Sequence, residues 1–341
     1  MAQLARTVTV LDSADLLAPG IERLRDRGVE VRVLPDGLSP AEAARSAADA
    51  VVILDATLAI RQAEIDQLRA TRLIVRAGIG YDLIDVAAAT ARGIWVANVP
   101  DYCADEVADH TVLLLMACAR RLDALGTAWR DAERWLAYDR LPPVRRPAEQ
   151  VLGIVGMGRI GARVATRARA FGWQVIGQDA ALPPDKVRAR GAEPVGLDEL
   201  FARADAITLH CPLTPETHHL VDAARLATTR PGVVIVNTSR GGLVDIASLD
   251  AALASGHVAA AGLDVLEDEP NVDLSQAVLA RPNVIATGHT AWYSVEARRD
   301  LALLCAEEAL RVLGGERPRN AVNVVNAVNV VNAVNAVNAP D

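Results

Sequence analysis

Apolar residues of this chain gather in short continuous runs, and amphipathic segments with helical spacing separate these runs. Strands that are apolar throughout, instead of alternating with polar residues, are typical of a parallel sheet covered on both faces. Regular alternation of such strands with helices predicts βα units. In residues 1–100 the β-like runs, one of which alternates with charged residues, are TVTVLD, VEVRVL, AVVIL, RLIVRAG and IWVANV.

A second series of the same kind begins at Val151, with the runs VLGIVG, WQVIGQD, AITLHC, VVIVNTS, AAAGLDV and NVIATGH. Between the two series lie a long predicted helix, residues 104–138, and the proline- and arginine-rich stretch 139–150, which we place on the surface. A last helix, predicted over 294–313, follows the second sheet and is free to return to the first. The fold class is therefore α/β, with two doubly wound parallel sheets.

A glycine-rich turn opens the second series. Gly156, Gly158 and Gly161 stand between a predicted strand and a predicted helix. Glycines permit a tight turn and let backbone amides approach a pyrophosphate, which then rests at the positive end of the helix. Asp179 ends the next apolar run. A carboxylate there accepts hydrogen bonds from both ribose hydroxyls and repels a 2′-phosphate, which favours NAD over NADP. The pattern predicts a Rossmann-like dinucleotide site.

Three chemically capable side chains follow later strands of this series. Arg240 comes after VVIVN, Glu269 after AAAGLDV and His289 after NVIAT. Ligands of open α/β sheets bind beyond the carboxyl ends of the strands, so we expect these groups to meet where the nicotinamide lies. Each residue alone is more easily explained as structure: a surface cation, a loop carboxylate before proline and a core histidine. Together they favour catalysis, with His289 as an acid–base group.

The chain resembles the D-isomer-specific 2-hydroxyacid dehydrogenase family, which includes phosphoglycerate, glycerate and D-lactate dehydrogenases and the corepressors called C-terminal-binding proteins. The resemblance extends from about Arg76 to Asn323 and rests on VLGIVGMGRIGARVA, LHCPLTPETHHLV, VNTSRGGLVD, GLDVLEDEP and the terminal histidine. The stretches RAGIGYDLID and HTAWYS look closest to the corepressor branch. Formate dehydrogenases carry glutamine at the position of Glu269, so formate is disfavoured as a substrate.

The resemblance implies a role for each catalytic candidate. Arg240 would bind the substrate carboxylate, His289 would donate or accept the proton, and Glu269 would be its carboxylate partner. The chemistry agrees, because a planar guanidinium binds a carboxylate bidentately and an ionised glutamate stabilises an imidazolium and fixes its tautomer. The resemblance also implies an NAD cofactor, a small 2-oxo or 2-hydroxy acid as substrate, and a homodimer.

Further ligand-binding positions are expected on both sides of the site. Backbone amides at Gly78 and Gly80 would reach the substrate carboxylate and Arg76 would add charge, although a turn with Arg76 in solvent fits the pattern equally well. Trp292 would line an apolar pocket or cap the following helix. The complete expected cofactor-binding set is Gly156, Gly158, Arg159, Ile160, Gly161, Asp179, Cys211, Pro212, Thr217, Thr238, Ser239 and Asp264, of which Asp264 would hold the nicotinamide amide.

The family resemblance also implies the domain boundaries. Residues 1–101 and 297–320 would form a discontinuous substrate-binding domain, residues 102–296 would form the NAD-binding domain, and the active-site cleft would lie between them. Both domains would be Rossmann- or flavodoxin-like. Residues 321–341 are a repeat of Ala or Val, Val and Asn. Because a period of three fits neither an amphipathic helix nor a two-sided strand, we expect this low-complexity tail to be disordered.

Composition narrows the partners and the compartment. A net charge of −8 without a block of basic residues argues against binding to nucleic acid or to an anionic membrane. No apolar run approaches the roughly 20 residues of a membrane span, and the start lacks a signal-peptide pattern, so we expect a cytoplasmic protein. The 4 cysteines form no CxxC pair and the histidines show no zinc-ligand spacing, so we expect reduced thiols and no metal.

Two alternatives remain open. An NAD(H)-sensing scaffold like the corepressors would keep the same residues and bind NADH without turnover. An enzyme acting on a phosphorus oxyacid such as phosphite, or on a phosphonate, could use Arg76 and Arg240 to hold the anion. The arginine-rich composition looks bacterial, which favours an enzyme. Because no regulatory small-molecule domain follows the catalytic part, we expect a protein other than the longer phosphoglycerate dehydrogenases.

Overall fold

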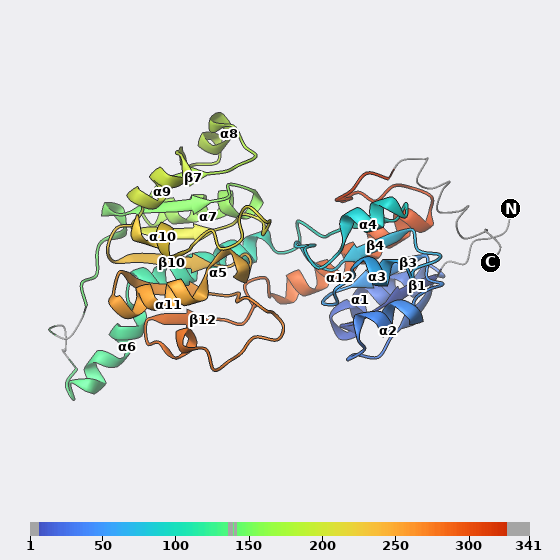
Figure 1. The fold of residues 1–341 in the computed structure, drawn as a ribbon, viewed down its shortest axis with the longest axis horizontal. Coiled ribbons are helices and arrows are strands. Elements are labelled where there is room, and N and C mark those ends of the chain that lie inside the picture. Colours follow the sequence, from blue (N-terminus) through green and yellow to red (C-terminus); the bar gives the residue numbers. More distant parts are fainter. Residues whose placement is uncertain (1–6, 136–138, 140–141, 326–341) are drawn as a thin grey trace. The chain divides into compact units, whose positions relative to one another are not determined.

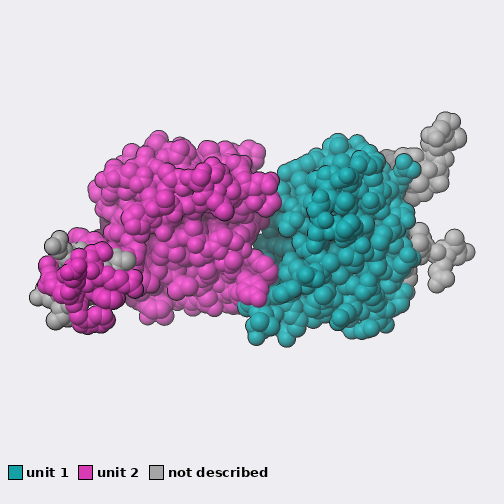
Figure 2. All heavy atoms as spheres, turned by 90° about the horizontal axis from the view of Figure 1, so that it is seen from below, with its two compact units in different colours: residues 1–103, 294–341 teal, residues 104–293 magenta. Residues whose placement is uncertain are grey.

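The computed structural model describes residues 7–135, 139 and 142–325, and its backbone contacts divide the chain into two compact units. Unit 1 contains residues 1–103 and 294–341, and unit 2 contains residues 104–293 (Figure 2). These boundaries lie close to those expected from the sequence. The assignment of unit 1 to substrate binding stays a prediction.

Unit 1 is a five-stranded parallel sheet with the strand order β2-β1-β3-β4-β5. Helices α1 and α12 bury one face of the sheet, and α2, α3 and α4 bury the other (Figure 1). Helix α12 packs on α1, so the last helix does return to the first sheet. The strands are β1 (Thr7–Val10), β2 (Glu30–Val33), β3 (Val52–Asp55), β4 (Leu73–Arg76) and β5 (Trp95–Ala97), and the helices are α1 (Ala14–Asp26), α2 (Pro40–Ser46), α3 (Gln62–Ile65), α4 (Val86–Ala91) and α12 (Val295–Leu313).

The start of the C-terminal repeat is part of this unit, which corrects the expectation of disorder for residues 321–325. Ala321 forms an antiparallel bridge with Ala97 at the edge of the sheet. The Asn323 side chain accepts a hydrogen bond from the Val96 amide at 2.9 Å and donates one to the Ile94 carbonyl, also at 2.9 Å. An amide side chain carries both a donor and an acceptor, so it satisfies the open edge of β5. Residues 326–341 lie outside the described residues.

Unit 2 is a seven-stranded parallel sheet with the strand order β12-β11-β10-β9-β6-β7-β8. Helices α5 and α7 cover one face and α9, α10 and α11 cover the other, so both units are doubly wound, as the apolar runs predicted. The strands are β6 (Val151–Val155), β7 (Gln174–Gln178), β8 (Glu193–Pro194), β9 (Ala206–Leu209), β10 (Val233–Asn237), β11 (Val258–Leu263) and β12 (Val284–Ala286), and the helices are α5 (Ala104–Ala119), α6 (Leu122–Asp131), α7 (Arg159–Ala170), α8 (Pro184–Ala189), α9 (Leu197–Arg203), α10 (Ala223–Ala227) and α11 (Ile246–Ser255), with short 3-10 turns at Pro147–Glu149, Gly241–Leu243 and Ala277–Ala280.

The single long helix predicted over residues 104–138 is wrong. Helix α5 ends at Ala119 and α6 begins at Leu122, and between them Arg121 takes the left-handed conformation with a φ of 51°. The Arg121 guanidinium pairs with Asp123 at 3.1 Å, which helps to hold the turn. A non-glycine residue in this conformation interrupts a helix without any sequence signal of the kind that glycine or proline gives.

No helix among the described residues is long and apolar enough to cross a bilayer.

The strand order of unit 2 places β6 between β7 and β9, which means that the direction of winding reverses there. Loops at the carboxyl ends of such strands form the usual ligand site of α/β folds. The glycine-rich turn follows β6 directly.

Candidate active site

The three glycines between β6 and α7 have different surroundings. Gly156 has a φ of 92°, and a Cβ on it would lie 2.5 Å from the carbonyl carbon of His210. A Cβ on Gly161 would lie 2.1 Å from the Gly156 carbonyl oxygen. Nothing lies within 4 Å of the place where a Cβ on Gly158 would stand. Two glycines therefore allow close backbone packing, and the third leaves the N-terminus of α7 open.

That opening fits the pyrophosphate of a dinucleotide. The first-turn amides of a helix have no partner within the helix and carry its positive dipole end, so they attract an anion. Two of the expected cofactor positions, Arg159 and Ile160, are the first residues of α7. A side chain at Gly158 would enter this opening.

Asp179 follows β7 beside this turn. Its carboxylate accepts hydrogen bonds from the amides of Met157 at 2.7 Å, Ala181 at 2.9 Å and Leu182 at 3.1 Å. The residue expected to bind the ribose thus also fixes the glycine turn. A carboxylate offers about four lone-pair sites, so acceptor capacity remains for a hydroxyl.

The other expected cofactor-side residues hold their own loops together. Thr238 pairs through its hydroxyl with Thr111 at 2.8 Å, and the Ser239 hydroxyl donates to the Cys211 carbonyl at 3.0 Å. The Thr217 hydroxyl donates to the Pro212 carbonyl at 2.8 Å. Burial raises the pKa of the Cys211 thiol to about 11, so this cysteine is not a nucleophile at neutral pH. Direct cofactor contacts by these residues stay predictions.

His289 and Glu269 form the central pair of the site. The Nδ1 atom of His289 lies 2.5 Å from Oε2 of Glu269, and 45% of the histidine side chain is exposed. The imidazole is therefore not turned into the protein interior. Because Nδ1 faces the carboxylate, Nε2 is the ring nitrogen left for a reacting group.

Arg240 contributes to the charges that act on Glu269. Burial alone would raise the pKa of Glu269, but the hydrogen bond and charge of His289, the Leu266 amide and the charge of Arg240 outweigh it and hold this pKa below its ordinary value. The Leu266 amide donates to Oε1 of Glu269 at 2.9 Å. The three residues predicted from separate strand ends are thus brought together.

Gly241 lets the backbone beside Arg240 approach the segment that carries Glu269. A Cβ on Gly241 would lie 1.9 Å from the carbonyl carbon of Leu266, so the backbone after Arg240 rests directly on the segment that carries Glu269. Arg240 itself donates from Nη1 to the Ser239 carbonyl at 2.7 Å, and its own carbonyl accepts from the Asn237 side chain at 2.8 Å. The first contact ties the guanidinium to the adjacent backbone, and the second fixes the backbone of Arg240.

Asp264 has a supporting role that the sequence did not reveal. It is only 2% exposed, and its carboxylate accepts hydrogen bonds from the Thr287 hydroxyl at 2.6 Å and from the amides of Thr290 at 2.8 Å and Ala291 at 3.0 Å. Its carbonyl also accepts from the His289 amide at 2.5 Å. Asp264 therefore positions the histidine segment. Its expected contact with the nicotinamide amide stays a prediction.

In unit 1, Arg76 ends strand β4 and is not in solvent. Its Nη1 lies 2.9 Å from the Asp55 carboxylate, and its Nε donates to the Gly80 carbonyl at 3.3 Å. The amide of Gly78 donates to the Arg76 carbonyl at 2.9 Å, and the contacts expected of Gly78 and Gly80 with a substrate carboxylate stay predictions. The role of Arg76 in substrate binding stays a prediction.

The aromatic pair after His289 lies at the end of unit 2. The rings of Trp292 and Tyr293 meet edge to face at 5.7 Å, and Trp292 is partly buried while Tyr293 is 56% exposed. A pocket lined by Trp292 stays a prediction.

Sequence reasoning missed one cluster near this site. Among the described residues, His218, His219 and Glu267 form a group whose ligand atoms lie within 4.8 Å of one another. Two adjacent histidines and a glutamate on a distant loop match no metal-binding spacing, so only the fold reveals them.

Residues 112–291 match the family model described as D-isomer specific 2-hydroxyacid dehydrogenase, NAD binding domain. The chain belongs to the D-isomer-specific 2-hydroxyacid dehydrogenase family. The matched region lies within unit 2, so the expected family and its NAD cofactor are confirmed. The special closeness to the corepressor branch stays a prediction.

The chain is similar in sequence to curated proteins and in fold to solved structures. A D-3-phosphoglycerate dehydrogenase of Mycobacterium tuberculosis is 40% identical over 316 residues, which are 91% of this chain and 58% of that protein. Among solved structures, a glyoxylate reductase from Paecilomyes thermophila has a TM-score of 0.83 at 30% identity and covers 93% of this chain and 98% of its own. A D-lactate dehydrogenase from Aquifex aeolicus, complexed with NAD and lactic acid, has a TM-score of 0.82 at 26% identity, with 94% and 100% covered.

The chain thus spans little more than half the length of the curated relatives that it matches. These relatives are phosphoglycerate dehydrogenases, so the expectation of a protein unlike that longer group finds no support in them.

Proposed function

We propose that this chain is an NAD-dependent dehydrogenase of small D-2-hydroxy acids, which in reverse reduces 2-oxo acids. The observation that carries this proposal is the contact of 2.5 Å between His289 Nδ1 and Glu269 Oε2, with Arg240 near enough to lower the pKa of the same carboxyl. An oriented imidazole beside a guanidinium supplies an acid–base group and an anion anchor in one place.

Each of these side chains has one task in the reduction. Bound NADH supplies the hydride that reaches the keto carbon. Arg240 binds the substrate carboxylate and orients the neighbouring carbonyl. His289 donates the proton on Nε2 to the carbonyl oxygen as negative charge develops there, while its Nδ1–H stays bonded to Glu269. Glu269 remains ionised and stabilises the imidazolium before the transfer. In oxidation, the neutral Nε2 accepts the hydroxyl proton.

The substrate class follows from the arginine and from the relatives. An arginine anchor fits an anionic group next to the reacting carbonyl, and a carboxylate in that place makes the substrate a 2-oxo acid. The curated relatives carry the name D-3-phosphoglycerate dehydrogenase, and this name favours a phosphorylated 2-hydroxy acid for the present chain.

A panel of substrates followed by NADH absorbance tests the proposal. We expect NADH oxidation with 2-oxo acids, fastest with 3-phosphohydroxypyruvate and slower with glyoxylate and pyruvate. NAD reduction by phosphite, or turnover of a phosphonate, would instead support the phosphorus oxyacid alternative. Tight NADH binding without turnover of any 2-oxo acid would contradict the enzyme and favour an NAD(H)-sensing scaffold.

The family resemblance also favours a homodimer joined through unit 2. Light scattering of the purified chain measures its molar mass directly, and a monomeric mass at micromolar concentration would contradict the dimer.

Two glycine substitutions separate cofactor binding from folding. Gly158→Ala should weaken NADH binding by about tenfold or more, equivalent to roughly 1.4 kcal/mol, without loss of stability, because its Cβ enters open space. Gly161→Ala should lower the free energy of unfolding by about 1–3 kcal/mol, because its Cβ meets a backbone oxygen. NADH fluorescence titration and urea denaturation measure the two effects, and an equal loss of stability in both variants would contradict this division.

A further inference from the structure

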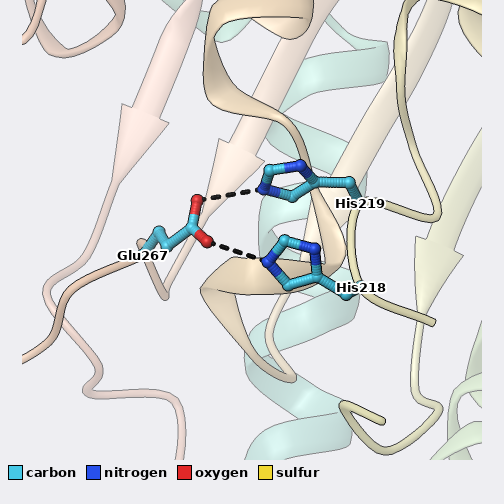
Figure 3. Close-up of side chains that lie close together, drawn as sticks. All are labelled: His218, His219 and Glu267. Atoms are coloured by element: carbon cyan, nitrogen blue, oxygen red, sulfur yellow. Dashed lines mark hydrogen bonds and ion pairs between the residues drawn. The ribbon is translucent and has the colours of Figure 1, made fainter. Parts of the chain in front are cut away.

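His218, His219 and Glu267 bring three metal-ligating groups to one point on unit 2 (Figure 3). The Nε2 atom of His218 lies 3.2 Å from Oε1 of Glu267, and the Nε2 atom of His219 lies 3.1 Å from Oε2. The two imidazole rings stack with their centroids 3.9 Å apart and their planes 27° apart. Each ring therefore directs its Nε2 atom at the carboxylate of Glu267.

The backbone holds the two rings in this arrangement. Both histidines lie in a turn, where His219 takes a left-handed conformation with a φ of 51°, and their rings lie side by side. The His219 amide donates to the Gly242 carbonyl at 2.8 Å, and the Val221 amide donates to the Leu243 carbonyl at 3.0 Å. The pair is thus fixed against the turn that follows Arg240.

We propose that His218, His219 and Glu267 bind one divalent transition-metal ion, with Zn²⁺ as the best match. Two imidazoles and one carboxylate are a ligand set that zinc takes in open sites, where water completes the coordination. Zinc–ligand distances of about 2.0–2.2 Å separate neighbouring ligands of a tetrahedral site by about 3.3 Å, and the two observed N···O distances are 3.1 and 3.2 Å. The distances between the carboxylate and the two imidazoles therefore match those of a zinc site.

Partial exposure gives the ion access and room for water. The side chains of His218, His219 and Glu267 are 49%, 36% and 39% exposed. Imidazole nitrogens select zinc, copper and nickel over magnesium and calcium, which prefer oxygen ligands. This assignment replaces the sequence-based expectation of no metal site, and it is independent of the reaction assigned to His289.

The ion also has a structural consequence. It joins the segment after β9, which carries the histidines, to the segment after β11, which carries Glu267. Glu269 stands two residues further along this second segment. Because an ion that binds only the folded protein raises its stability, Zn²⁺ should increase the thermal midpoint of unit 2.

Calorimetric titration of the tag-free, chelator-treated chain with ZnCl₂ tests the site. We expect one equivalent to bind, and affinity to fall by at least about tenfold in both His219→Asn and Glu267→Gln. Asparagine tolerates the left-handed conformation at residue 219, and glutamine at residue 267 keeps a hydrogen-bond acceptor for the imidazoles, so both variants should fold. The matched control is Asp268→Asn on the same loop, which should bind Zn²⁺ like the unchanged chain.

Co²⁺ gives a second readout that identifies the ligands. A site of nitrogen and oxygen ligands should show visible d–d absorption without a thiolate-to-metal band, and this absorption should disappear in Glu267→Gln. Far-UV circular dichroism and NADH binding confirm that each variant is folded. No binding of Zn²⁺ at millimolar concentration, binding unchanged in both ligand variants, or a thiolate band that reveals cysteine ligands would overturn the proposal.

Discussion

Replacement of His289 by asparagine is expected to lower kcat by about 10²–10⁴-fold while NADH still binds, because the site then lacks its proton donor. Asparagine is the sharpest substitution here, since His289 has a φ of 56° and asparagine adopts the left-handed conformation readily. The backbone that Asp264 holds should therefore stay in place. Stopped-flow turnover of the best 2-oxo acid and NADH fluorescence titration measure the two properties separately.

A glutamate substitution provides the graded control. Glu269→Gln keeps a hydrogen-bond acceptor for Nδ1 but removes the charge that stabilises the imidazolium, so kcat should fall by less than in the histidine variant. Asp268→Asn changes the exposed neighbouring carboxylate and should leave turnover unchanged. If the His289 variant turned over at the rate of the unchanged chain, the proton donor would have to be another group and the proposed mechanism would be wrong.

The two sheets could be predicted because their strands are buried on both faces. Strands β1, β3, β9 and β10 are buried at every position, and such strands appear in a sequence as β-branched and apolar runs with few charged residues. The break between α5 and α6 could not be predicted, since it depends on the left-handed conformation of Arg121. The placement of residues 321–325 was equally hidden, because Asn323 acquires its partners only from the edge of β5.

The approach of the candidate catalytic residues to one another could be predicted from the sequence, but the contacts that support them could not. Arg240, Glu269 and His289 each follow a strand, and parallel strands bring their carboxyl ends to one edge of the sheet. The support of the histidine segment by Asp264 depends on three hydrogen bonds between loops, which no spacing along the chain encodes. The cluster around Glu267 was missed for the same reason.

Disruption of the ion pair between Arg76, at the end of β4, and Asp55, at the end of β3, should have the largest effect on stability. The Asp55 side chain is 0% exposed, and Arg76 at 2.9 Å is the cation that faces it. Burial raises the pKa of Asp55 to about 7, although the charge of Arg76 opposes this and Asp12 adds to it. Arg76→Met removes the cation and leaves a buried carboxylate, which typically costs about 3–5 kcal/mol of folding free energy. Arg72→Met changes an exposed arginine of the same segment and should cost no more than about 0.5 kcal/mol.

The deficit of the Arg76→Met variant should also grow with pH. Without the guanidinium, the pKa of Asp55 rises above its value of about 7, so the folded variant retains a proton that the unchanged protein releases. Below that value both folded forms are protonated, and the difference in stability is smaller. Above it the difference should increase by up to about 1.4 kcal/mol per pH unit, until the variant also ionises. Urea denaturation at about pH 6 and about pH 8.5 measures this change. An equal loss of unfolding free energy at both pH values would show that Asp55 does not change its ionisation when Arg76 is lost. A loss no larger than that of Arg72→Met would show that the pair does not stabilise unit 1.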